Sequence, residues 1–134
     1  MEHSRKYGII GRRLIKSLEE FADIAASDVK IAYLSSDELK KKNRKIVFGQ
    51  CYKVNPNYTW CCKYDFFIVI YEPNVERFSD DQIETLIRHE LHHVGVDFEG
   101  NETQFYLVPH DVEEFWSIIN DKGLDWSDVN ATRS

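Results

Sequence analysis

The feature that most constrains the fold of this chain is a strongly marked helix start at residues 78–83. Ser79 can cap the helix, and Gln82 stands three residues later, which together form the pattern of a capping box. Asp80 and Asp81 occupy the first turn, where the helix dipole favours negative charge. We therefore predict a helix from Ser79 to about Val94, ended by Gly95.

This predicted helix carries the residues Leu-Ile-Arg-His-Glu-Leu-His-His-Val at positions 86–94. His89 and His93 are four residues apart, so their side chains share one face and can hold one Zn²⁺. Glu90 projects about 100° away from His89, beside the ion, where a general base is needed. The alternative is two polar surface histidines, but the apolar neighbours Leu86, Ile87, Leu91 and Val94 favour a metal site that faces the core.

A catalytic zinc needs a third protein ligand from elsewhere in the chain. The pattern H-E-x-x-H-x-x-G-x-x-H fails, because Glu99 stands where its last histidine would be. We favour His110, because imidazole is a common zinc ligand and a helix start can project it into a cleft; Glu113 and Glu114 remain alternatives. His92 is expected to face solvent or to support a ligand.

The remaining pattern predicts an α+β fold in one domain spanning residues 1–134, with a core over about 11–122 and a loose tail at 124–134. We expect a helix at 11–26 and strands at 28–34, 45–54 and 64–72. The strand at 64–72 is apolar throughout, which predicts that both of its faces are covered. Residues 35–43 read as a short helix or loop, and 96–108 as loop with a short strand at 105–107. A last helix should run from Pro109 to Gly123. About three strands would then form a short mixed or antiparallel sheet against these helices.

Composition points to an ordinary globular protein in a reducing compartment. No apolar run reaches about 18 residues, and the first residues lack the apolar segment of a signal peptide, so we expect a cytoplasmic protein. The three cysteines, Cys51, Cys61 and Cys62, form a poor disulfide framework and are expected to be reduced.

Charge is distributed unevenly along the chain. Residues 1–67 carry 13 Lys and Arg against 8 Asp and Glu, whereas residues 68–134 carry 4 against 15. The basic excess is densest at Lys40–Lys45. Such a cluster can contact the phosphates of a nucleic acid, although a solvated turn is the more usual explanation.

At the strands and histidine-bearing segments named above, the chain resembles the phage metallopeptidase family, which is itself similar to SprT-like zincins. The resemblance rests most specifically on residues 86–93 and on His110-Asp111-Val112-Glu113-Glu114-Phe115. It implies zinc ligands at His89, His93 and His110, Glu90 as the catalytic acid and base, and a compact zincin-like α+β core. A phage or prophage origin would place the protein in a bacterial host cell.

These observations lead to the hypothesis of a zinc metallopeptidase that binds one Zn²⁺ and hydrolyses protein or peptide substrates, with Glu90 as general base. The alternative is a non-enzymatic phage or prophage protein, stabilised by zinc, that binds host protein or nucleic acid through the Lys40–Lys45 cluster. No membrane partner is expected.

Overall fold

A mixed four-stranded sheet forms the centre of the protein. The computed structural model describes residues 1–58, 60–100 and 102–109. The strands stand in the order β1 (Glu2–His3), β2 (Ile31–Ser36), β6 (Phe66–Tyr71) and β5 (Gly49–Lys53). β2 and β6 are parallel, and the other two pairs are antiparallel. The predicted α+β class and mixed sheet are confirmed, with four strands in place of about three.

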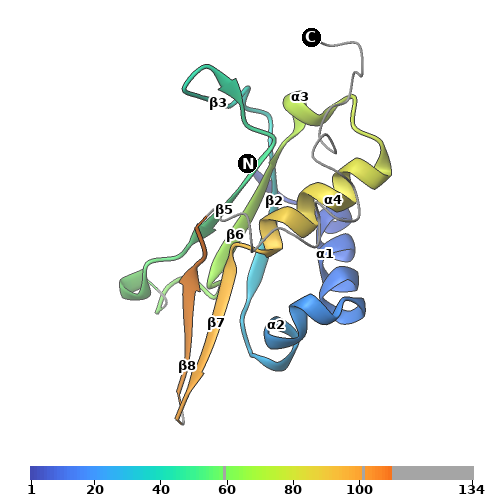
Figure 1. Cartoon of the computed structure of the whole chain (residues 1–134). Helices are drawn as coiled ribbons and strands as arrows, with labels where there is room; N and C mark the ends of the chain where they lie inside the picture. The colour runs from blue at the N-terminus through green and yellow to red at the C-terminus, as the bar shows by residue number, and fades with distance from the viewer. Residues whose placement is uncertain (59, 101, 110–134) are drawn as a thin grey trace.

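Helices cover one face of this sheet (Figure 1). They are α1 (Arg5–Ser17), the short 3-10 helix η1 (Glu19–Phe21), α2 (Ala22–Ala26) and α4 (Asp80–Leu91). On β6, Phe66, Ile68 and Ile70 belong to the core beneath these helices. Val69 and Tyr71 belong to a second cluster on the other face. The prediction that both faces of this strand are covered is therefore confirmed.

The predicted helix at 11–26 is longer and is interrupted. It starts at Arg5, because the Ser4 side chain accepts a hydrogen bond from the Tyr7 amide at 3.2 Å. It stops at Leu18, which is extended, and η1 and α2 follow. Gly11 allows α1 to approach the sheet closely, since a Cβ there would lie 2.3 Å from the ring of Tyr33. The six residues before the predicted start, 5–10, are also helical, and helical periodicity did not predict them.

The helix start predicted at Ser79 is confirmed in both its parts. The Gln82 amide donates to Ser79 Oγ at 3.2 Å, and the Ser79 amide donates to Gln82 Oε1 at 2.9 Å. The predicted end is wrong, because α4 stops at Leu91 and Val94 already belongs to a strand. Gly95 does not stop a helix; a Cβ there would lie 2.4 Å from the ring of its cross-strand partner Tyr106.

Two hairpins replace the predicted loops. β7 (Val94–Glu99) and β8 (Glu102–Leu107) pair over six positions where loop was predicted for 96–108, although the expected strand at 105–107 lies within β8. β3 (Lys41–Lys42) and β4 (Lys45–Ile46) pair within the basic segment, so the predicted strand at 45–54 is divided between β4 and β5. The short helices η2 (Pro56–Tyr58) and α3 (Glu72–Val75) complete the described elements.

The cysteine prediction is confirmed, because Cys51, Cys61 and Cys62 form no disulfide. None of the described helices combines the length and the apolar character that crossing a membrane requires. The predicted helix from Pro109 to Gly123 and the tail at 124–134 lie outside the described residues, apart from Pro109 itself.

The capping box at Ser79 should contribute measurably to stability. We expect Ser79→Ala to lower the free energy of unfolding by about 1 kcal/mol, because the Gln82 amide loses the side-chain oxygen that accepts its hydrogen bond. Ser79→Asp should retain most of that stability, since Asp is an equally good cap. Urea denaturation of the three proteins measures the difference, and equal midpoints for Ser79→Ala and wild type would contradict the assignment.

Candidate metal centre

The candidate site lies where α4 ends against the β7–β8 hairpin. The His92 amide is shared between the carbonyls of Arg88 at 3.3 Å and His89 at 3.2 Å. The His93 amide donates to the carbonyl of Glu90 at 3.0 Å, a three-residue spacing. The last turn is therefore tightened in the manner of a 3-10 helix. All three histidines were predicted to lie within the helix; His89 lies in its last turn, whereas His92 and His93 follow its end.

His89 and His93 nevertheless lie side by side. Their ring centroids are 5.5 Å apart, and the ring planes meet at 75°. His93 is buried, with 7% of its surface exposed. Two imidazoles this close can supply two of the donors of one metal ion.

A strand partner orients the ring of His93. The Val108 amide donates to the His93 carbonyl at 2.8 Å, and His93 Nδ1 lies 2.6 Å from the Val108 carbonyl oxygen. A carbonyl only accepts, so Nδ1 carries the proton and donates it. Nε2 is then the basic nitrogen, and such a bond from the remote ring nitrogen is typical of metal-binding histidines.

Glu90 lies deep beside this pair, with 4% of its surface exposed. Burial removes water from the carboxylate and raises the pKa of Glu90 to about 8. Burial, with a smaller contribution from the charge of Glu90, raises the pKa of the Cys51 thiol on β5, so the thiol stays protonated. A carboxyl group whose pKa lies near neutrality can both accept and release a proton.

Glu90 and His93 line one open cleft of about 250 Å³. Its other walls come from β3, from β5 and from the end of β8: Lys42, Gly49, Gln50, Cys51, Tyr52, Leu107, Val108 and Pro109. Gly49 allows the strand to lie close to its neighbours, since a Cβ there would stand 3.1 Å from the Val69 carbonyl oxygen and 3.5 Å from Leu86. Gly49 therefore marks a close approach of β5 to β6 and α4.

Three polar residues of this cleft were not predicted as members of the site: Lys42, Gln50 and Tyr52. Gln50 is held in place by Tyr71, whose hydroxyl donates to Gln50 Oε1 at 2.7 Å. The hydroxyls of Tyr52 and Tyr71 lie 3.2 Å apart. The Lys40–Lys45 cluster marked Lys42 as a candidate binding residue, but no motif identifies Gln50 and Tyr52, because strand pairing rather than spacing in the sequence brings them to the site.

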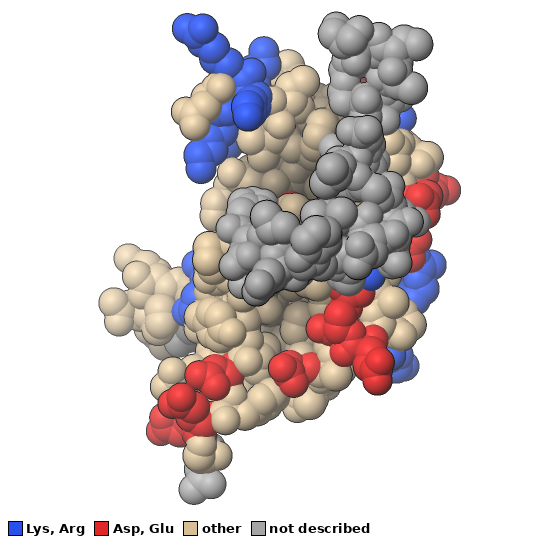
Figure 2. Space-filling model, in the orientation of Figure 1, with Lys and Arg blue, Asp and Glu red and all other residues tan. Residues whose placement is uncertain are grey.

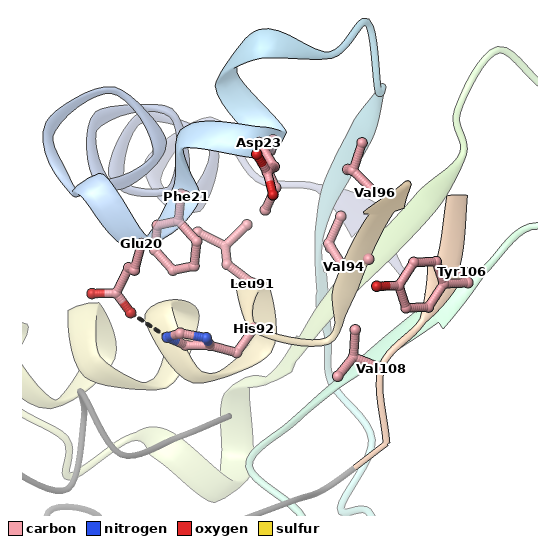
Figure 3. Close-up of a pocket in the computed structure, with 11 residues that line it drawn as sticks. Glu20, Phe21, Asp23, Leu91, His92, Val94, Val96, Tyr106 and Val108 are labelled. Carbon is pink, nitrogen blue, oxygen red and sulfur yellow. Dashed lines mark hydrogen bonds and ion pairs between the residues drawn. The ribbon is translucent and has the colours of Figure 1, made fainter. Parts of the chain in front are cut away.

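His92 faces the opposite side of the helix end, in a second cavity of about 210 Å³ (Figure 3). Its Nε2 bonds to Glu20, which also binds Arg88 at 2.5 Å, and its ring lies 5.0 Å from that of Phe21. The side chain is only 13% exposed, so the expectation of a solvent-facing residue is corrected. Burial lowers the pKa of His92. This cluster ties the end of α4 to η1.

The remaining predicted site residues, His110, Glu113 and Glu114, lie outside the described residues. Over residues 1–58, 60–100 and 102–109, no three His, Cys, Asp or Glu side chains come together to hold a metal. The described part therefore supplies an imidazole pair with a fixed tautomer next to a buried acid. This donor set fits part of a zinc site and requires at least one more ligand.

Comparison with known proteins gives one finding. A family model described as "Putative phage metallopeptidase" matches residues 1–132. Neither the comparison with curated proteins nor that with solved structures gave a match.

The buried acid makes the stability of the metal-free protein depend on pH. The pKa of Glu90 is about 8 in the folded state against an ordinary 4.5, so the folded protein keeps a proton that the unfolded chain releases. The free energy of unfolding of wild type should therefore fall as pH rises from about 4.5 to 8. Glu90→Gln should not show this fall, and at pH 8.5 it should be more stable than wild type by a few kcal/mol, on the order of 1.4 kcal/mol per pKa unit.

Urea denaturation at pH 5, 7 and 8.5 in the presence of a chelator makes this measurement. Glu19→Gln is the control, because Glu19 is exposed on η1 and should follow wild type at each pH. Parallel pH profiles for wild type and Glu90→Gln would contradict the burial argument.

Proposed function

The chain belongs to the phage metallopeptidase family, and on this premise we propose that it hydrolyses peptide bonds with one bound Zn²⁺ and with Glu90 as the general base. The observation that carries the proposal is that the deeply buried Glu90 shares a cleft with His93, whose ring lies beside that of His89. The experiment that tests it is the comparison of Glu90→Gln with wild type described below.

The proposed ligands are His89, His93 and His110. The hydrogen bond from His93 Nδ1 to Val108 leaves Nε2 as the ligating nitrogen. Only Pro109 separates Val108 from His110, and consecutive Cα atoms are 3.8 Å apart. Because Val108 binds His93, this short connection keeps His110 close to the candidate site along the chain. It supports His110 over Glu113 and Glu114, which follow three and four residues later.

In the proposed reaction, Glu90 accepts a proton from the attacking water and then delivers it to the nitrogen of the departing amine. When bound, a divalent ion supplies a Lewis acid for the carbonyl oxygen and acidifies the water. A cation held by the neighbouring histidines favours the ionised form of Glu90, which offsets the effect of burial on its pKa. Glu90 then titrates closer to the range in which it serves as a base at neutral pH.

The edge strand β5 is the proposed binding site for the substrate backbone. β5 is the last strand in the sheet order, and its residues 49–52 line the cleft that contains Glu90. An extended peptide can add to such an edge by main-chain hydrogen bonds, which hold it without regard to side-chain identity. The scissile carbonyl would then lie along a wall of the same cleft as Glu90.

The first test separates metal binding from chemistry. We expect Glu90→Gln to keep its zinc, measured by mass spectrometry under native conditions, and to lose cleavage of a fluorogenic peptide by about 10²–10⁴-fold. Glu19→Gln, the same chemical change at an exposed position, should cleave like wild type. Equal cleavage by wild type and Glu90→Gln would refute the mechanism.

The third ligand is tested by single alanine substitutions at His110, Glu113 and Glu114. His110→Ala should weaken zinc affinity by more than about 100-fold, beyond the effect expected of a residue that only supports a ligand. The two glutamate variants should bind zinc like wild type. Competition with a chromophoric chelator measures all three, and a loss confined to Glu113→Ala or Glu114→Ala would assign the ligand to that carboxylate instead.

A further inference from the structure

The hairpin of β3 and β4 presents a concentrated positive charge. Its exposed cationic residues are Lys41, Lys42, Arg44 and Lys45, and Lys40 stands at its base. In the space-filling view, a group of blue side chains marks the place of this hairpin in Figure 1 (Figure 2). We call residues 40–45 the basic hairpin.

The turn of the basic hairpin carries a cation at a conformational cost. Asn43 and Arg44 both have positive φ, 53° and 67°, as the two-residue connection between β3 and β4 requires. Asn tolerates this conformation, but the second position usually holds Gly, because a Cβ there is crowded. An arginine in such a place suggests that its charge serves a function.

The base of the basic hairpin is fixed to the body of the protein. The Asn74 side chain on α3 donates to the carbonyls of Lys40 at 2.9 Å and Val47 at 2.8 Å. The Val47 amide also donates to the Lys40 carbonyl at 3.1 Å. From this anchored base, Lys42 reaches the wall of the cleft that contains Glu90 and His93. Of the charges on the basic hairpin, that of Lys42 therefore lies at the candidate active site.

Little nearby negative charge neutralises the basic hairpin. In the part of the chain that the structure describes, the ion pair of this segment joins Lys40 to Glu38 at 3.9 Å, and Lys41, Lys42, Arg44 and Lys45 form none. Acidic residues instead gather near the tip of the β7–β8 hairpin, which carries Asp97, Glu99 and Glu102. The net charge of the whole chain is −6, so the basic hairpin is a local excess of positive charge on an acidic protein.

We propose that the basic hairpin selects peptide substrates that carry acidic side chains within a few residues of the scissile bond. The proposal rests on the peptidase function proposed above and names its substrate class. Charges act over about 8 Å at physiological salt, so Lys42 can only favour acidic groups bound in or beside the cleft. A nucleic acid fits less well, because a polyanion needs an extended basic surface, whereas Lys42 is the one Lys or Arg among the described residues that line the cleft and the tip of the β7–β8 hairpin is acidic.

The test uses three fluorogenic peptides that differ only in two flanking residues: two Glu, two Gln or two Lys. We expect wild type to prefer the acidic peptide, and Lys42→Glu/Lys45→Glu, a change at two cross-strand partners, to reduce the ratio of kcat/KM for acidic over neutral peptide by about 10-fold. The preference should disappear near 1 M salt, where the screening length is about 3 Å. The control Lys6→Glu/Lys16→Glu makes the same change in net charge at exposed positions of α1 and should keep the wild-type ratio.

A binding measurement separates this proposal from the peptidase function. Fluorescence anisotropy with Glu90→Gln protein gives the Kd of the labelled acidic and neutral peptides without cleavage, and the acidic peptide should bind about 10-fold more tightly. Absence of cleavage by wild type would refute the peptidase function alone. Equal Kd values, or a hairpin-dependent preference for a single-stranded DNA oligonucleotide over the acidic peptide, would overturn the role of the basic hairpin.

Arg44→Gly distinguishes recognition from a purely structural role. Glycine relieves the positive φ, so the variant should unfold at a higher temperature than wild type, and it removes one charge, so the acidic preference should fall. A variant that gains thermal stability and keeps the full preference would show that Arg44 takes no part in recognition and would contradict the charge argument.

Discussion

The paired hydrogen bonds between His93 and Val108 connect the elements of the candidate site. They extend the β7–β8 ladder by one pair, to His93, which lies two residues after the end of α4 at Leu91. The chain therefore passes directly from the helix into the hairpin. The same contact fixes the proton on Nδ1 of His93 and leaves Nε2 as the unprotonated ring nitrogen. Helix end, imidazole tautomer and hairpin position are therefore determined together. A change in any one of them would displace the ring of His93 from that of His89.

Burial of Glu90 is the second constraint on the site. The carboxyl group lies between the last turn of α4 and the edge strand β5, and this position raises its pKa to about 8. An uncompensated buried carboxyl lowers the stability of the metal-free fold as pH rises from about 4.5 to 8, whereas a nearby cation favours its charged form. The arrangement thus couples metal binding to the protonation of the residue proposed to act as the base. On the other side of α4, Glu20 binds both Arg88 and His92 and holds the same helix end against η1.

Prediction from the sequence succeeded where local chemistry decides the structure. The capping box at Ser79 lies within four residues, and the strand at 66–71 is apolar throughout, so both could be recognised without knowledge of their neighbours. Prediction failed at the end of α4 and in the β7–β8 hairpin. Gly95 reads as a helix stop, but its role is to make room for the Tyr106 ring on the opposite strand. Such a contact between distant residues leaves no periodic signal in either segment.

The sequence by itself determined the spacing of His89, Glu90 and His93, the start of their helix and membership of the phage metallopeptidase family. It could do so because residues a few positions apart on one helix have a nearly constant relation in space. Only the tertiary structure decided which imidazole nitrogen is protonated, how deeply Glu90 is buried and that Gln50, Tyr52 and Lys42 share its cleft. Those properties arise from strand pairing and from exclusion of water, and both depend on segments brought together by folding.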